Sequence, residues 1–129
     1  MSTKLLMTVS AIILGVTGII LSFFPVEVSN YLGFAGTEFI ILQILGALYF
    51  AFGLINWTAK ANLIGGIYSR PVAIGNFAHF MIGALALVKL SFHSAAPSYI
   101  WIAAVIYSTF AVFFGYIFFT SPVAKNKSV

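Results

Sequence analysis

The chain has 129 residues, of which 62% are hydrophobic and 6% are charged, whereas soluble domains are about 45 to 50% apolar and about 25% charged. This composition excludes a soluble globular domain and predicts an integral membrane protein. The net charge of +4 comes from a few scattered basic residues, which argues for a role in membrane orientation and against nucleic-acid binding. The absence of cysteine excludes disulfides, thiolate metal sites and a cysteine nucleophile.

The first apolar stretch, residues 5–24, follows Lys4 and is interrupted only by small or hydroxyl side chains. Its length is the roughly 20 residues that a helix needs to cross about 30 Å of hydrocarbon. A secretory signal peptide is the alternative, because a basic start and an apolar stretch also describe a signal. We favour an uncleaved span, since Phe23, Phe24 and Pro25 stand where a cleavage site needs small residues.

Residues 25–38 hold both acidic residues of the chain, Glu27 and Glu38. Pro25 suits the first turn of a helix and Gly33 suits its end. The pattern predicts a short helix over residues 26–32 that lies in the membrane interface. A structured loop is an equal alternative.

Three further apolar stretches predict membrane spans over residues 39–59, 71–91 and 99–119. The Gly65-Gly66 pair predicts a turn between the second and third spans. Pro71 begins the third span, where a proline is tolerated best. Links this short force neighbouring spans to run antiparallel. We therefore expect an all-α membrane protein, one domain over residues 1–129 with four transmembrane helices in an up-down-up-down bundle.

The basic residues predict the orientation of this bundle. Only Lys89 falls on one side, together with the two glutamates, while five basic residues fall on the other: Lys4, Lys60, Arg70, Lys125 and Lys127. Cytoplasmic loops carry the excess of lysine and arginine. We expect a multi-pass protein of the bacterial inner membrane with both termini in the cytoplasm.

Stripes of small residues occur on all four spans, and they predict close helix packing. In lipid, helices associate by close contact over small side chains rather than by the hydrophobic effect. The stripes are Ala11, Gly15, Gly18 and Ser22; Gly46 and Gly53, with Ala47 and Ala51; Gly75, His79 and Gly83; and Ala104, Ser108, Ala111 and Gly115. They predict either packing within one chain or a homo-oligomer, and the sequence leaves both open.

His79 is the sharpest candidate for chemistry, because it lies near the middle of the third span with Asn76 one turn earlier on the same face. A buried imidazole can bind haem iron, a quinone carbonyl or a proton. The alternative, which we favour, is a structural hydrogen bond. His93 lies about 21 Å further along a helix, so the two histidines cannot share a metal, and we predict no metal site. Tyr49, Tyr107, Ser108 and Thr109 are candidate partners at the same depth.

A second candidate site combines Asn56 and Trp57 at the end of the second span with Arg70 and Asn76 at the start of the third. Antiparallel spans would place these residues at similar depth, where they could bind an anionic or amide-bearing headgroup. Hydrogen bonding between helices is the interpretation we favour for both asparagines. A homo-oligomeric pore lined by Gln43, His79 and Asn76 is a further alternative. For Gln43, helix-to-helix hydrogen bonding is the simpler role.

No span holds an acidic residue, and the chain has no phosphate-binding glycine loop, no paired carboxylates and no nucleophile beside a base. This argues against an enzyme and against a small proton-coupled exporter. A small membrane transferase with an arginine and tyrosine site stays open.

The blocks QILGALYFAFGLINWTAK (Gln43–Lys60) and RPVAIGNFAHFMIGALALVKL (Arg70–Leu90), after a first span ending in FFP, resemble small four-span bacterial membrane proteins of the DoxX-like superfamily. The resemblance implies an inner-membrane four-helix protein, in some members tied to quinone or redox partners. It assigns no functional residue.

These observations predict a non-enzymatic accessory or structural subunit that self-associates or joins a larger membrane complex. Membrane lipids are the other expected partners, and the sequence identifies no cofactor. The alternatives are binding of a lipidic ligand, quinone or haem near His79, Asn76 and Tyr49, and a small homo-oligomeric channel or transporter.

Overall fold

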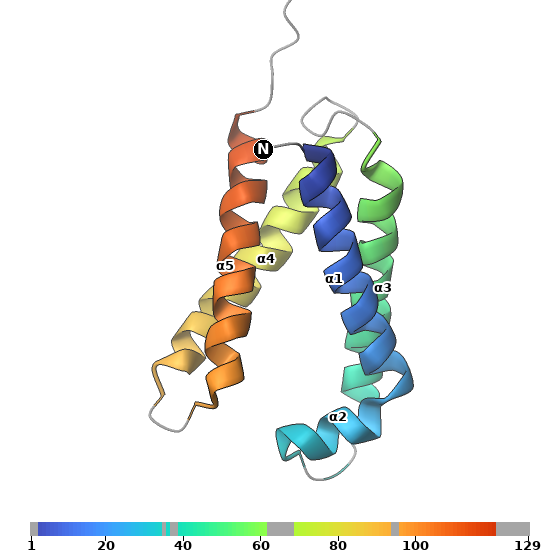
Figure 1. Ribbon diagram of the computed structural model, residues 1–129, viewed down its shortest axis with the longest axis vertical. Helices are drawn as coiled ribbons and strands as arrows, with labels where there is room; N and C mark the ends of the chain where they lie inside the picture. Colours follow the sequence, from blue (N-terminus) through green and yellow to red (C-terminus); the bar gives the residue numbers. More distant parts are fainter. Residues whose placement is uncertain (1–2, 35, 37–38, 62–68, 94–95, 121–129) are drawn as a thin grey trace, which may run out of the picture. The chain divides into compact units, whose positions relative to one another are not determined.

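The computed structural model describes residues 3–34, 36, 39–61, 69–93 and 96–120. Five helices form in this part of the chain: α1 (Thr3–Phe23), α2 (Pro25–Leu32), α3 (Phe39–Ala59), α4 (Arg70–Ser91) and α5 (Ser98–Phe119) (Figure 1). All except α2 are long and apolar enough to cross a membrane. The fold class predicted from the sequence is confirmed: the chain is an all-α, multi-pass membrane protein.

The four long helices lie within two residues of the predicted spans at each end. This agreement reflects how strictly the bilayer sets helix length, since each backbone polar group at membrane depth needs a partner inside its own segment. The predicted Gly65-Gly66 turn and the basic residues Lys125 and Lys127 lie outside the described residues.

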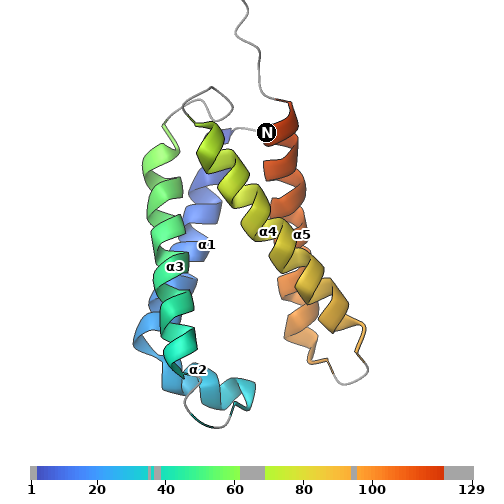
Figure 2. The ribbon, with the colours of Figure 1, turned by 180° about the vertical axis from the view of Figure 1, so that it is seen from behind.

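The chain divides into two compact units, Met1–Ala61 and Asn62–Val129, here called the N-terminal and C-terminal units. In the N-terminal unit α1 and α3 lie side by side and α2 lies across their end (Figures 1 and 2). In the C-terminal unit α4 packs obliquely along α5 (Figures 1 and 2). The single domain expected from the sequence stays a prediction.

The segment after α1 forms the short helix that the sequence left balanced against a loop. Only Phe24 separates α1 from α2, and Pro25 is the first residue of α2, where its missing N–H costs nothing. Gly33 ends the helix in the left-handed conformation, with φ of 76°. The Gly33 N–H donates to the Asn30 carbonyl and the Phe34 N–H donates to the Ser29 carbonyl, which is a Schellman motif.

The contact between α1 and α3 is a contact of backbones, made possible by glycines. A Cβ atom added at Gly18 would lie 2.5 Å from the Phe50 nitrogen and 2.8 Å from the Gly46 carbonyl oxygen. At Gly53 it would lie 2.8 Å from the Gly15 nitrogen. Gly18 thus faces Gly46 while Gly15 faces Gly53, so the two helices run antiparallel. The glycines of the stripes predicted on these two spans therefore pack within one chain, whereas Ala47 and Ala51 are exposed.

The contact between α4 and α5 is built from aromatic rings that lie on small residues. Phe80 is fully buried and stacks on Phe110 and Phe114, with ring centroids 4.7 and 5.7 Å away. The Tyr107 ring lies on Gly83, so closely that a Cβ there would be 2.5 Å from the ring. Phe77 near the start of α4 stacks on Phe118 near the end of α5, so these helices are also antiparallel.

Candidate functional site

Asn56 is the most deeply buried polar residue of the N-terminal unit together with Ser10, and both have no exposed surface. The Asn56 side-chain amide donates a hydrogen bond of 3.0 Å to the Ser10 hydroxyl, which donates one of 3.0 Å to the Met7 carbonyl. The chain of bonds joins α3 to the backbone of α1. This arrangement is the helix-to-helix hydrogen bond that the sequence favoured for Asn56.

The other predicted site residues of α3 lie at three different depths. The Gln43 amide donates to the Ser22 carbonyl of α1 over 3.5 Å, at the long end for a hydrogen bond, which is again a contact between helices. Tyr49 lies half-buried at the middle of α3. Trp57 is 49% exposed, and the Lys60 ammonium lies 2.8 Å from the centroid of its indole ring.

In the C-terminal unit, Arg70 and Asn76 lie in the first two turns of α4, and both contact residues of the same unit. Asn76 is fully buried, and its amide donates a hydrogen bond of 2.9 Å to the Val72 carbonyl one turn earlier. Arg70 is exposed, and its guanidinium lies 5.7 Å from the Phe118 ring centroid, within the range of a cation–π contact.

His79 meets Tyr107 on the neighbouring helix α5. The Tyr107 hydroxyl and His79 Nε2 are 3.5 Å apart, the ring centroids are 5.6 Å apart, and both side chains are half-buried. Of the partners considered from the sequence, Tyr107 is therefore a direct neighbour. Thr109 instead donates to the Val105 carbonyl of its own helix.

The His79–Tyr107 pair can present a hydroxyl and an imidazole to a carbonyl or another small polar group. Phe80 flanks both rings, with centroids 5.0 Å from His79 and 5.2 Å from Tyr107. No group of three or more histidines or carboxylates that could hold a metal occurs among the described residues.

The predicted site residues are divided between the two units. Tyr49, Asn56, Trp57 and Gln43 belong to the N-terminal unit, and Arg70, Asn76 and His79 belong to the C-terminal unit. The predicted headgroup pocket, the placement of Tyr49 beside His79 and the pore lining each combine residues of both. All three stay predictions.

Sequence reasoning missed two features of the N-terminal unit. It did not single out Ser10, because the partner of Asn56 depends on the register of α1 against α3. It also missed two hollows along the outside of this helix pair. The smaller is about 260 Å³ and is lined by Ala11, Ile12, Gly15, Phe50, Gly53, Leu54 and Trp57. The larger is about 530 Å³ and is lined by Ile19, Ser22, Phe23, Ala47, Phe50, Ala51 and Leu54.

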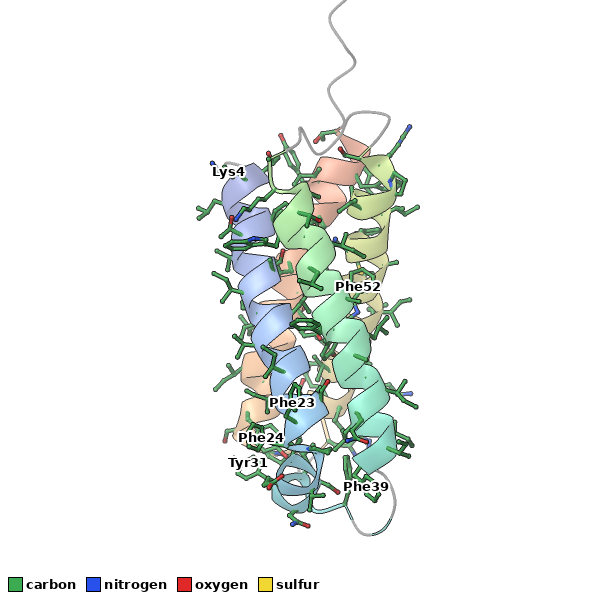
Figure 3. The ribbon with its side chains drawn as sticks, turned by 90° about the vertical axis from the view of Figure 1, so that its right-hand side faces the viewer. Lys4, Phe23, Phe24, Tyr31, Phe39 and Phe52 are labelled. Atoms are coloured by element: carbon green, nitrogen blue, oxygen red, sulfur yellow. The ribbon has the colours of Figure 1, made fainter. Side chains whose placement is uncertain are left out.

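The two ends of the N-terminal unit differ in chemistry. Figure 3 shows Lys4 at one end of α1, and Phe23, Phe24 and Tyr31 grouped at the other. The three rings are exposed, as expected for aromatic side chains in the interface of a bilayer. Lys60 follows α3 at the Lys4 end, because α3 is antiparallel to α1.

Helix lengths, apolar surfaces and interfacial aromatic residues define the chain as an α-helical membrane protein that crosses the bilayer more than once. Comparisons with protein-family models, curated proteins and solved structures give no match for the chain.

Proposed function

We propose that the chain is a non-enzymatic subunit of the bacterial inner membrane that self-associates or joins a larger membrane complex, in an accessory or structural role. The proposal rests on what the polar side chains at membrane depth contact within the chain. Asn56 bonds to Ser10 of α1, Asn76 to the backbone of its own helix, and His79 lies beside Tyr107. Polar groups that bond within and between helices in this way stabilise helix packing.

The exposed faces of the long helices support the same proposal. Large apolar side chains cover them, among them Ile44 at 66%, Ile82 at 70% and Val112 at 67% exposed. A surface of this kind suits contact with lipid tails or with other membrane helices. The related proposals of an inner-membrane location, cytoplasmic termini and kinship with DoxX-like proteins rest on charge distribution and sequence blocks alone.

The test is native mass spectrometry of the full chain, purified in a mild detergent, with an absorption spectrum of the same sample. We expect an oligomer of the 13.9 kDa chain, or a complex with other subunits, and no visible absorption band. The His79→Leu variant should form the same assembly, with a change in stability only. A monomer that carries a tightly bound small molecule would contradict the proposal.

A second candidate function, binding of a quinone or other lipidic ligand, is favoured by the His79–Tyr107 pair. A quinone carbonyl can accept hydrogen bonds from an imidazole N–H and a phenol, and the neighbouring Phe80 offers an aromatic wall. Extraction of the purified protein with organic solvent tests this alternative. Quinone that co-purifies with the native chain and is lost from His79→Leu and Tyr107→Phe would establish it.

A further inference from the structure

The two hollows of the N-terminal unit adjoin near the middle of α3. They share Phe50 and Leu54, and Phe50 lies one residue from the midpoint of α3 (Phe39–Ala59). From there the smaller hollow extends toward Trp57, and the larger one extends toward Phe23 at the end of α1. The smaller hollow therefore lies mainly on the Trp57 side of the middle of α3, and the larger one mainly on the Phe23 side.

The smaller hollow and Lys60 together span about the depth of one leaflet. On α3 its lining runs over seven residues from Phe50 to Trp57, a rise of about 10 Å, and Lys60 lies about 5 Å beyond, so the distance from Phe50 to Lys60 is about 15 Å along the helix. Half of the bilayer hydrocarbon is also about 15 Å thick. The side chains of the lining are apolar apart from the indole N–H of Trp57, and the lining includes the small residues Ala11, Gly15 and Gly53. A polar ligand would find no partner inside, whereas a hydrocarbon chain fits.

The open end of this hollow is basic. Trp57 lines it, and the Lys60 ammonium rests on the Trp57 ring. The Asn56–Ser10 hydrogen bond sets the register: Lys60 lies four residues beyond Asn56 and Lys4 lies six before Ser10, about 6 and 9 Å toward the same end. Glu27, in α2, lies at the opposite end of the unit (Figure 1).

We propose that this hollow is a binding site for an anionic phospholipid, with one acyl chain between Ile12, Gly15 and Leu54 and the headgroup phosphate at Lys60 and Lys4. Trp57 lies between the two parts, at the depth where amphipathic rings are favoured. Charge complementarity selects an anionic lipid over a zwitterionic one. The site goes beyond the proposed subunit role and does not depend on it.

The charge of the site is tested with two lipids of identical chains. The purified full-length protein is mixed with equal amounts of dioleoyl phosphatidylglycerol and dioleoyl phosphatidylcholine, and bound lipids are counted by native mass spectrometry. We expect an excess of phosphatidylglycerol adducts of about 25-fold, because each of the two lysines favours an anionic lipid by about fivefold. Lys60→Gln should remove most of this excess. Lys60→Arg should keep it, as should the control Lys89→Gln in the C-terminal unit.

The hollow itself is tested by filling it. A Cβ atom at Gly15 would meet no atom within 4 Å, so Gly15→Leu should occupy the hollow without separating α1 from α3. Binding of both lipids should fall in this variant, while Ala86→Leu, on an exposed part of α4, should leave binding unchanged. If Gly15→Leu does not elute as a folded species in gel filtration, the comparison of Lys60→Gln with Lys89→Gln decides.

Equal retention of the two lipids by the native chain would overturn the proposal, as would an unchanged preference in Lys60→Gln. A dimer that Gly15→Leu dissociates, with no preference between the lipids, would also overturn it, because a second copy of the chain would then fill the hollow.

Discussion

Ser10 and Asn56 show how a single pair of polar side chains joins two membrane helices. Both are fully buried, and their 3.0 Å hydrogen bond is the contact that relates the depth of α1 to that of α3. The Ser10 hydroxyl also donates to Met7 of its own helix, so it serves as acceptor and donor at once. Hydrogen bonds between membrane helices average about 0.6 kcal/mol and reach about 1.7 kcal/mol.

We predict that Ser10→Ala lowers the free energy of unfolding by about 1 kcal/mol, because the buried Asn56 amide loses an acceptor. Unfolding by sodium dodecyl sulfate, followed by circular dichroism, measures the change. Thr58→Ala is the matched control, since the Thr58 hydroxyl is exposed and donates only to its own helix. A Ser10→Ala effect no larger than that of Thr58→Ala would contradict the importance of this bond.

Helices α1 and α3 pack differently from α4 and α5. The first pair meets backbone to backbone at Gly18, Gly46 and Gly53, whereas in the second pair the rings of Tyr107 and Phe77 lie on Gly83 and Gly115. Backbone contact brings many atoms within the range of dispersion forces. It also leaves no room for a side chain.

The pair Gly18→Ala and Gly15→Ala tests this contact within one helix. We predict that Gly18→Ala destabilises the protein by about 1 to 3 kcal/mol, because the new methyl group would overlap the backbone of Phe50 and Gly46. Gly15→Ala adds the same atom in open space and should be neutral or stabilising, since alanine favours helix over glycine. Equal effects in thermal unfolding monitored by circular dichroism would contradict the close approach at Gly18.

At the scale of the whole molecule, charge and aromatic residues distinguish one end of the N-terminal unit from the other. Lys4 lies at one end and the exposed rings of Phe23, Phe24 and Tyr31 lie at the other (Figure 3). Lys60 directly follows the end of α3 on the Lys4 side, and Glu27 belongs to α2 on the opposite side. The positive-inside rule assigns the lysine end to the cytoplasm. The proposed topology thus has a direct experimental signature.

Single cysteines introduced into this cysteine-free chain report the topology. In spheroplasts we predict that a membrane-impermeant maleimide labels Glu27→Cys, which is exposed on α2, and leaves Lys4→Cys unlabelled. Detergent permeabilisation should expose Lys4→Cys to the reagent and serves as the control for its reactivity. Labelling of Lys4→Cys before permeabilisation would reverse the orientation.

Sequence reasoning predicted the helices well, because the thickness of the bilayer dictates the length of an apolar span. It also predicted the positions of close packing at Gly18, Gly46 and Gly53, since small residues at helical spacing have few other uses in lipid. It did not predict Ser10 as the partner of Asn56. That pairing depends on how far one helix is shifted along the other. The periodicity of a single helix carries no information on this shift.

The candidate site was predictable only in part. Tyr107 was among the expected neighbours of His79 because depth in the membrane follows from residue number. The aromatic stacking of Phe80 with Phe110 and Phe114 was not predicted, since in so apolar a chain nothing in the sequence separates rings that pack from rings that face lipid. The hollows along α1 and α3 depend on which side chains leave space, and no local pattern encodes that.

The two tryptophans of the chain fall one in each unit and in contrasting surroundings. Trp57 lies under the Lys60 ammonium, while Trp101 meets the Phe92 ring edge to face at 5.5 Å. A cation close to an indole ring alters its emission, whereas a phenyl ring carries no charge. Intrinsic fluorescence of Trp57→Phe and Trp101→Phe therefore gives each half of the chain its own optical signal, and coincident or separate melting of the two signals distinguishes one cooperative folding unit from two.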